Sequence, residues 1–371
     1  MSKPWVTTTC TLTGLSLMLS AGASSVAGQQ STAANGGGGS KAATASKASG
    51  TPRTPWGDPD LQGSWSTDSA YAIPMQRPAQ FAGRAELTDE EFKDKIDRDT
   101  KRRTEALHIG DGGIGAISND AAWITKTFRQ TSLLVEPADG KMPPLTPEAQ
   151  RRQALAPRGT YGNGPLDGPE DFGLYDRCIT LGVVGSVTPK VYGNGHRIIQ
   201  GPGYVAFLNE MIHEHRIIPL DGRPHPGKNI KQYMGDSRGH WDGNTLVVET
   251  TNLNGKTSYS GVDVTLVERF TRLEPDLLRY EAIIDDPKTY TRPLKISIPL
   301  VSPPGYQVLA YDCHEGNKAL MQALGGERAE DRAIEADRQK GIIRARKPVQ
   351  NGLGVGGSPT PAPVVSEADP R

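Results

Sequence analysis

The sequence predicts a mainly β protein, an antiparallel lipocalin-like barrel or sandwich with a few peripheral helices. From residue 196 onward, short apolar segments alternate with turns rich in Gly, Pro and Asp at regular spacing, a pattern typical of sandwiches and barrels. The 43 Gly and 29 Pro of the 371 residues favour a turn-rich domain over a helical bundle. No run of alternating strands and helices points to a parallel sheet.

The predicted elements follow in order along the chain. Thr88 and Glu91 form a capping box that begins a helix, and Thr146-Pro147-Glu148 begins a second one with Pro at its first position. A charged helix over 327–340 closes the domain. The predicted strands are 196–200, 204–213, 216–220, 245–251, 264–272, 277–285, 294–301 and 306–313.

The N-terminus predicts export. Lys3 precedes an uncharged, apolar and small-residue run from Val6 to Leu19, and Ser25-Val26-Ala27 is a small-x-small cleavage site. The run is too short and too rich in Thr and Ser to span a bilayer. We therefore expect a periplasmic or secreted protein without a membrane span. The predicted organisation is a signal peptide over 1–27, a flexible linker over 28–53, one β-rich domain over 54–340 and a disordered tail over 341–371.

Two cysteines remain after the signal peptide, Cys178 and Cys313. In an oxidising compartment, two distant cysteines most simply form one disulfide. The alternative is a nucleophilic Cys313 beside His314, which is disfavoured because a free thiol there is quickly oxidised.

At the start of the domain, Gly63-Ser64-Trp65 is similar to the G-x-W of lipocalin-type barrels, whose Trp plugs the closed end of the barrel. Any strand that begins with a buried Trp would look the same.

Charge and motifs exclude several function classes. The chain carries 42 basic and 42 acidic residues, so it has no electrostatic footprint for nucleic acid. The run from Gly110 to Gly115 has the spacing of a dinucleotide fingerprint, but it follows a charged helix and lies in no β-α-β unit. We expect no nicotinamide or flavin cofactor.

The most polar strand segment is 209–216. If this strand is continuous, Glu210, Glu214 and Arg216 lie on one face, and His213 and His215 form an H-x-H pair on the other. Metal binding needs further convergent ligands, so we favour a solvated outer face and predict no metal. Glu210 follows an apolar run, and a buried carboxylate needs a partner. Arg216 is the expected partner, either in a structural ion pair or in the polar floor of a barrel cavity.

Two loops and the end of the last predicted strand collect further polar residues. These are His225, then Asp236, Arg238 and Trp241 in a long polar loop, and finally His314 after Cys313. A His beside a carboxylate can perform acid–base chemistry, although loops also collect such residues for turns.

Four segments resemble those of a large family of exported bacterial proteins, common in soil bacteria and mostly of unknown function. They are IIPLDGRPHP, MGDSRGHWDGNTLVVETTN, LVERFTR and YDCHEGN, and the resemblance extends from Trp56 to Arg328. It implies no established activity, and the His215 position departs from the family pattern. It implies that the family's motif blocks include Glu210, Arg216, His225, Asp236, Arg238, Trp241 and His314.

We therefore expect an exported enzyme that acts on a small organic or sugar-like substrate without a cofactor, as a lyase, isomerase or hydrolase. His225 or His314 would act as the base together with Glu210, and Arg216 or Arg238 would hold an anionic group, near Asp236 and Trp241. We expect Glu210, Arg216, His225 and His314 to share one cavity. The alternative is a non-catalytic, lipocalin-like protein that binds a small ligand.

Overall fold

The computed structural model describes residues 51–108, 124–155, 166–259, 261 and 263–345. The predicted signal peptide, most of the predicted linker and tail, and the glycine-rich run from Gly110 to Gly115 lie outside the described residues. Within the described ranges, no helix combines the length and the apolar character that crossing a bilayer requires.

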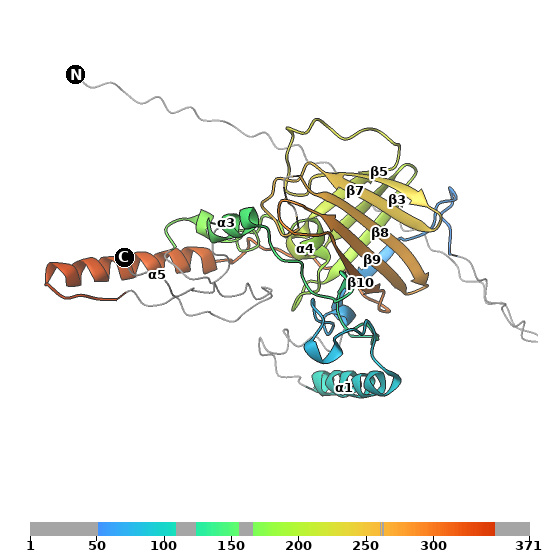
Figure 1. The fold of residues 1–371 in the computed structure, drawn as a ribbon, viewed down its shortest axis with the longest axis horizontal. Helices are drawn as coiled ribbons and strands as arrows, with labels where there is room; N and C mark the ends of the chain where they lie inside the picture. The colour runs from blue at the N-terminus through green and yellow to red at the C-terminus, as the bar shows by residue number, and fades with distance from the viewer. Residues whose placement is uncertain (1–50, 109–123, 156–165, 260, 262, 346–371) are drawn as a thin grey trace, which may run out of the picture. The chain divides into compact units, whose positions relative to one another are not determined.

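The described residues are mainly antiparallel β-structure with few helices, as the turn spacing predicts (Figure 1). The α-helices are α1 (Asp89–His108), α3 (Pro147–Leu155), α4 (Val183–Val187) and α5 (Ala319–Gln339). The strands are β1 (Gly63–Ser66), β2 (Leu134–Glu136), β3 (Gly195–Gly201), β4 (Tyr204–Asn209), β5 (His215–Pro219), β6 (Asp236–Asp242), β7 (Thr245–Thr251), β8 (Thr265–Glu274), β9 (Leu277–Asp285) and β10 (Leu294–Val301).

The ten strands of the described residues belong to one sheet. Its order is β5-β4-β3-β1-β10-β9-β8-β7-β6, and β2 pairs with β10 beside this path. Among the described residues no ladder joins the two edge strands, β5 and β6, so hydrogen bonds do not close the sheet. The neighbouring arrows of β8, β9 and β10 can be followed in the orange part of Figure 1.

Side chains from opposite parts of the sheet nevertheless meet on its inner face. Phe207 on β4 contacts Phe270 on β8 with ring centroids 5.4 Å apart, although β3, β1, β10 and β9 lie between these strands in the sheet order. At the edges, a Cβ on Gly239 of β6 would lie 2.7 Å from Leu220 and 2.9 Å from Ile218. The sheet is therefore curled, and its edges approach each other through side chains.

Period-two alternation builds this interior. On β8, Leu266, Glu268 and Phe270 are buried, and the residues between them are more exposed. Trp65, which we compare with the lipocalin Trp, is 1% exposed, and its indole N–H donates to the Leu61 carbonyl at 2.9 Å. The G-x-W segment therefore forms a strand with a buried Trp.

The predicted starts of the first two helices are confirmed, whereas that of the third is wrong. Thr88 and Glu91 exchange the two hydrogen bonds of a capping box at the start of α1. At the start of α3, the Ala149 amide donates to Thr146 Oγ1 at 3.1 Å. α5 begins at Ala319, eight positions before the predicted start at residue 327.

Three predictions of strands and loops are wrong. The segment 306–313 forms no strand. The polar loop expected over 235–243 contains strand β6, because Ser237 and Gly239 are small enough for the crowded inner face and alternate with polar residues that face outward. The strand predicted over 204–213 ends at Asn209, because Ile212 and His213 have positive φ angles of 62° and 45°.

Candidate functional site

A cavity of about 490 Å³ lies beside the Cys178–Cys313 disulfide. We call it the tyrosine pocket because three of its walls are tyrosine side chains. Its lining residues are Phe172, Tyr175, Asp176, Tyr192, Tyr311, Asp312, Cys313, Glu315, Gly316, Asn317, Ala319, Leu320 and Ala323. The volume falls in the range of small-molecule sites, roughly 300–1,000 Å³.

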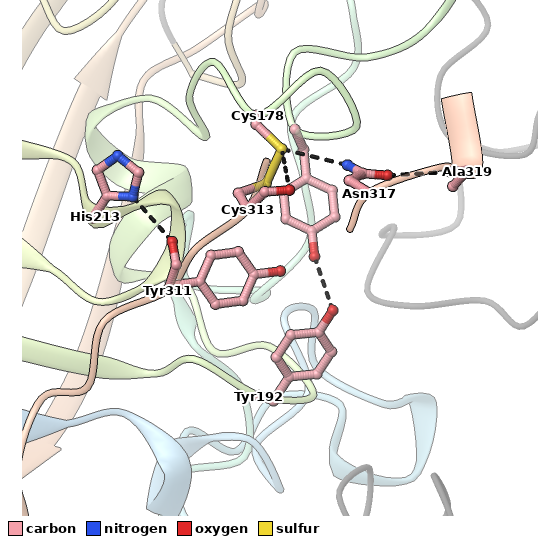
Figure 2. Close-up of a disulfide and its surroundings, with 8 residues drawn as sticks. Cys178, Tyr192, His213, Tyr311, Cys313, Asn317 and Ala319 are labelled. Atoms are coloured by element: carbon pink, nitrogen blue, oxygen red, sulfur yellow. Dashed lines mark hydrogen bonds between the residues drawn. A yellow bond between two sulfur atoms is a disulfide. The ribbon is translucent and has the colours of Figure 1, made fainter. Parts of the chain in front are cut away.

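The aromatic side chains of the pocket lie against one another. The rings of Tyr192 and Tyr311 are stacked with centroids 6.2 Å apart and an interplanar angle of 26°, and the hydroxyl groups of Tyr175 and Tyr192 are 3.3 Å apart. Figure 2 shows the ring of Tyr311 close to the disulfide and the ring of Tyr192 farther from it. Phe172 continues the aromatic surface, and it packs in a small hydrophobic cluster with Leu324 of α5.

The disulfide joins two segments that are distant in sequence and that both line this pocket. Cys178 and Cys313 form the predicted bond across a separation of 135 residues. The following Asn317 donates to the Cys178 sulfur at 3.5 Å and accepts from the Ala319 amide at the start of α5 (Figure 2). The backbone carbonyl of Tyr311 lies 3.0 Å from His213 Nδ1. Covalent and polar contacts therefore fix this part of the pocket wall.

Tyr175 and Tyr311 stay neutral at physiological pH. Burial raises the pKa of Tyr175 far above its usual value, and it raises the pKa of Tyr311 to about 12. The charged groups of the pocket are the carboxylates of Asp176, Asp312 and Glu315, and no basic side chain is among the described residues that line it.

The predicted site residues do not share one cavity, and the predicted Glu210–Arg216 pair is wrong. Arg216 on β5 points to the inner face and forms a two-pronged ion pair with Glu268 on β8, at 2.5 and 2.6 Å. Tyr280 donates to the same carboxylate at 3.0 Å, and Arg216 donates to Ser237 of β6 at 3.3 Å. Arg216 is therefore part of the packed interior.

Glu210 lies just after β4 and accepts three hydrogen bonds. They come from the Gly195 amide at 2.9 Å, the Tyr306 hydroxyl at 3.0 Å and the Leu309 amide at 3.1 Å. Tyr306 and Leu309 belong to the segment that leads to Cys313. The contacts of Glu210 therefore attach this segment to the end of β4 and indicate a structural role for its carboxylate.

His225, Asp236 and Arg238 do come together, with Glu249, on the outer face of the sheet; we call these four residues the outer-face cluster. His225 Nδ1 lies 2.6 Å from Asp236 Oδ1, and Arg238 lies 2.9 Å from the other Asp236 oxygen. Glu249 is the cross-strand partner of Arg238, and its carboxylate is 3.7 Å from His225 Nε2. The cluster combines a His–Asp pair with a guanidinium.

The remaining predicted residues lie elsewhere. Trp241 packs against the main core, and its indole N–H is buried without a hydrogen-bond partner among the described residues. His314 is exposed on the turn after Cys313 and does not line the tyrosine pocket. His213 and His215 share no strand, because the chain turns at Ile212 before β5 begins, so the premise of the H-x-H pair is wrong.

Another buried polar group is His196 on β3, which none of the sequence motifs contains. Its side chain is fully buried, its Nδ1 lies 3.0 Å from Asn209 Oδ1, and its Nε2 has no partner among the described residues. Burial, reinforced by the nearby Lys190 charge, lowers the pKa of His196 to about 3. The imidazole is neutral in the folded protein.

The sequence carried a signal for some of the missed residues. Glu268 alternates with Leu266 and Phe270 in the segment LVERFTR, so period two alone places it on the buried face. Tyr311 lies two positions before Cys313, within the segment YDCHEGN. Tyr175 and Tyr192 carry no such pattern, and only the tertiary structure brings them to Tyr311.

Comparisons of the chain with protein-family models, curated proteins and solved structures find no match.

Proposed function

We propose that this protein binds a small molecule in the tyrosine pocket, with a curled, lipocalin-like sheet as the scaffold. The observation that carries the proposal is the pocket itself: a cavity of about 490 Å³ walled by Phe172, Tyr175, Tyr192 and Tyr311 and held by a disulfide. Aromatic walls with a few polar groups are typical of ligand sites. A pre-formed wall lowers the entropic cost of binding.

The inner face of the sheet is less suited to a ligand, although lipocalins bind theirs inside the barrel. The rings of His196, Phe207, Phe270 and Tyr280 form a chain there, with successive centroids 5.5, 5.4 and 5.1 Å apart. These side chains and the Arg216–Glu268 pair occupy positions that would line a cavity. We therefore place the ligand outside the curled sheet.

Export to the periplasm or beyond the cell is part of the proposal. The disulfide supports it, because such bonds persist in oxidising compartments, and so do the signal-peptide features of residues 1–27. Membership of the family of exported bacterial proteins that the four segments suggest is proposed on the same basis.

A second candidate function is cofactor-independent acid–base catalysis at the outer-face cluster. The observation that favours it is the 2.6 Å contact between His225 and Asp236. A carboxylate at Nδ1 orients the imidazole, so that Nε2, which faces Glu249, would be the ring atom that exchanges a proton with a substrate. Arg238 could hold an anionic substrate group beside it.

One experiment tests both functions. The thermal unfolding of the protein is measured with a panel of sugars, carboxylic acids, amines and aromatic metabolites, since a ligand that binds only the folded state raises the melting temperature. We expect a compound whose stabilising effect is lost in Tyr192→Leu and kept in His225→Gln. Loss only in His225→Gln would favour the outer-face cluster, and a panel without any effect would contradict binding at either site.

A further inference from the structure

The charges of the tyrosine pocket have one sign. Asp176, Asp312 and Glu315 line it, together with the side chains of Asn317 and the tyrosines. Asp312 and Glu315 are exposed at the rim, whereas Asp176 is half-buried and accepts a hydrogen bond from the Gly173 amide at 3.1 Å. Three carboxylates around one cavity attract a cation and repel an anion.

The aromatic walls favour the same charge. The face of an aromatic ring carries a negative electrostatic potential, so a cation held over it is attracted. The rings of Tyr192 and Tyr311 are stacked with centroids 6.2 Å apart and an interplanar angle of 26°, and the hydroxyl group of Tyr175 lies near that of Tyr192. Phe172 and Leu320 add an apolar wall that suits methyl or methylene groups.

The geometry points to an organic cation and not to a metal ion. In the described part of the chain, no three His, Cys, Asp or Glu side chains are arranged so that they could hold a metal. The three carboxylates are instead distributed around a cavity of about 490 Å³, which accommodates an ammonium group together with the rest of an organic molecule. Such a molecule is attracted by the ring faces and by carboxylates distributed around the cavity, and it needs no converging set of coordinating side chains.

We propose that the tyrosine pocket binds a small organic molecule through an ammonium group, placed against the rings of Tyr192 and Tyr311 and attracted by Asp176, Asp312 and Glu315. This proposal rests on the proposed ligand-binding function of the same pocket and names the chemical class of its ligand.

The direct probe is choline, compared with 3,3-dimethylbutan-1-ol, which has the same shape without the charge. Binding of each to the full-length, disulfide-bonded protein is measured by isothermal titration calorimetry. We expect choline to bind more tightly by about tenfold or more, the factor that a cation–π contact and nearby carboxylates provide. Raising the ionic strength should weaken choline binding and leave that of the alcohol nearly unchanged.

Variants locate the site. Tyr192→Leu removes a ring face and should weaken choline binding about tenfold, whereas Tyr192→Phe keeps the ring and should retain most of the affinity. Tyr204→Leu is the matched control, since Tyr204 is 43% exposed on β4 and does not line the pocket. Each variant is first checked for an unchanged circular dichroism spectrum and a cooperative thermal transition.

The contribution of the pocket's carboxylates is tested with variants in the same way. The double variant Asp312→Asn/Glu315→Gln should weaken choline binding severalfold and reduce its salt dependence. Glu90→Gln on α1 is the control, because Glu90 is exposed and does not line the pocket. Both carboxylates are exposed, so folding should not depend on them.

The outcomes separate the two proposals. If choline and its neutral analogue bind equally, or if a neutral compound of the panel binds at Tyr192 while choline does not, the inference of a cationic ligand is wrong and the binding function stands. Choline binding that survives both Tyr192→Leu and the double carboxylate variant overturns the assignment of the cation to this pocket. If neither choline nor any compound of the panel binds, both proposals are wrong.

Discussion

At the scale of single residues, burial fixes the chemical state of His196. Its imidazole lies on the inner face of the sheet against the ring of Phe207, with centroids 5.5 Å apart. Asn209 satisfies one ring nitrogen, and Nε2 has no partner among the described residues. Protonation of Nε2 would place an uncompensated charge in the core, and the nearby Lys190 makes this still less favourable.

This state predicts a pH dependence of folding. The pKa of His196 falls from the usual 6.5 to about 3 in the folded protein, so between these values only the unfolded chain binds the proton. The stability that His196 contributes is fully present above about pH 6.5 and is lost as the pH falls towards 3, by about 1.4 kcal/mol per pH unit.

The measurement is chemical denaturation at pH 7 and pH 5, for the wild type and for His196→Asn. The wild type should lose about 2 kcal/mol more than the variant between the two pH values. Contributions of surface carboxylates cancel in this comparison because they are common to both proteins. Equal losses in the two proteins would show that His196 is protonated without cost in the folded state.

At the scale of elements, side-chain contacts connect distant strands that no backbone hydrogen bonds join in the described part of the sheet. Arg216 on β5 and Glu268 on β8 pair across the inner face, with contributions from Tyr280 on β9 and Ser237 on β6. Both members of the pair are almost completely buried, with side-chain exposures of 6% and 0%. The pair therefore connects both edge strands of the open sheet to its centre.

We expect Glu268→Gln to destabilise the protein by about 3–5 kcal/mol, because it leaves the Arg216 guanidinium buried without a counter-charge. The double variant Arg216→Met/Glu268→Gln should be more stable than this single variant. Glu249→Gln, on the outer face of β7, is the control and should change stability by less than about 1 kcal/mol. Urea denaturation curves provide the comparison, and a Glu268→Gln curve equal to that of the wild type would contradict the role of the pair.

At the scale of the whole molecule, the disulfide connects the chain before α4 with the segment that follows β10. Opening a bond that closes a loop of this length should cost up to about 4–5 kcal/mol, because the unfolded chain gains conformational freedom. Protein without residues 1–27, denatured without reduction, should contain close to zero titratable thiol. The detection of two thiols per chain, or equal stability of the Cys178→Ser/Cys313→Ser variant, would contradict this role.

The sequence by itself determined many of the local elements. Alternation and turn residues placed β7 and β10 at their observed bounds, and capping residues such as Thr88 located the helix starts. Such signals are readable because they depend on neighbours in the chain. The polarity of 236–242 predicts a loop where the structure has strand β6, because an edge strand with small inward residues lacks the apolar alternation of the other strands.

Only the tertiary structure decided which polar groups meet. Arg216 pairs with Glu268 and not with Glu210, which is nearer in sequence, because curling of the sheet places β5 opposite β8. The turn at Ile212 instead directs Glu210 to Tyr306. In the same way, the disulfide brings the segment of Tyr311 to those of Tyr175 and Tyr192 and forms the tyrosine pocket. Sequence spacing fixes the face on which a side chain lies, but contacts between distant segments depend on how the sheet curves and where its connections cross.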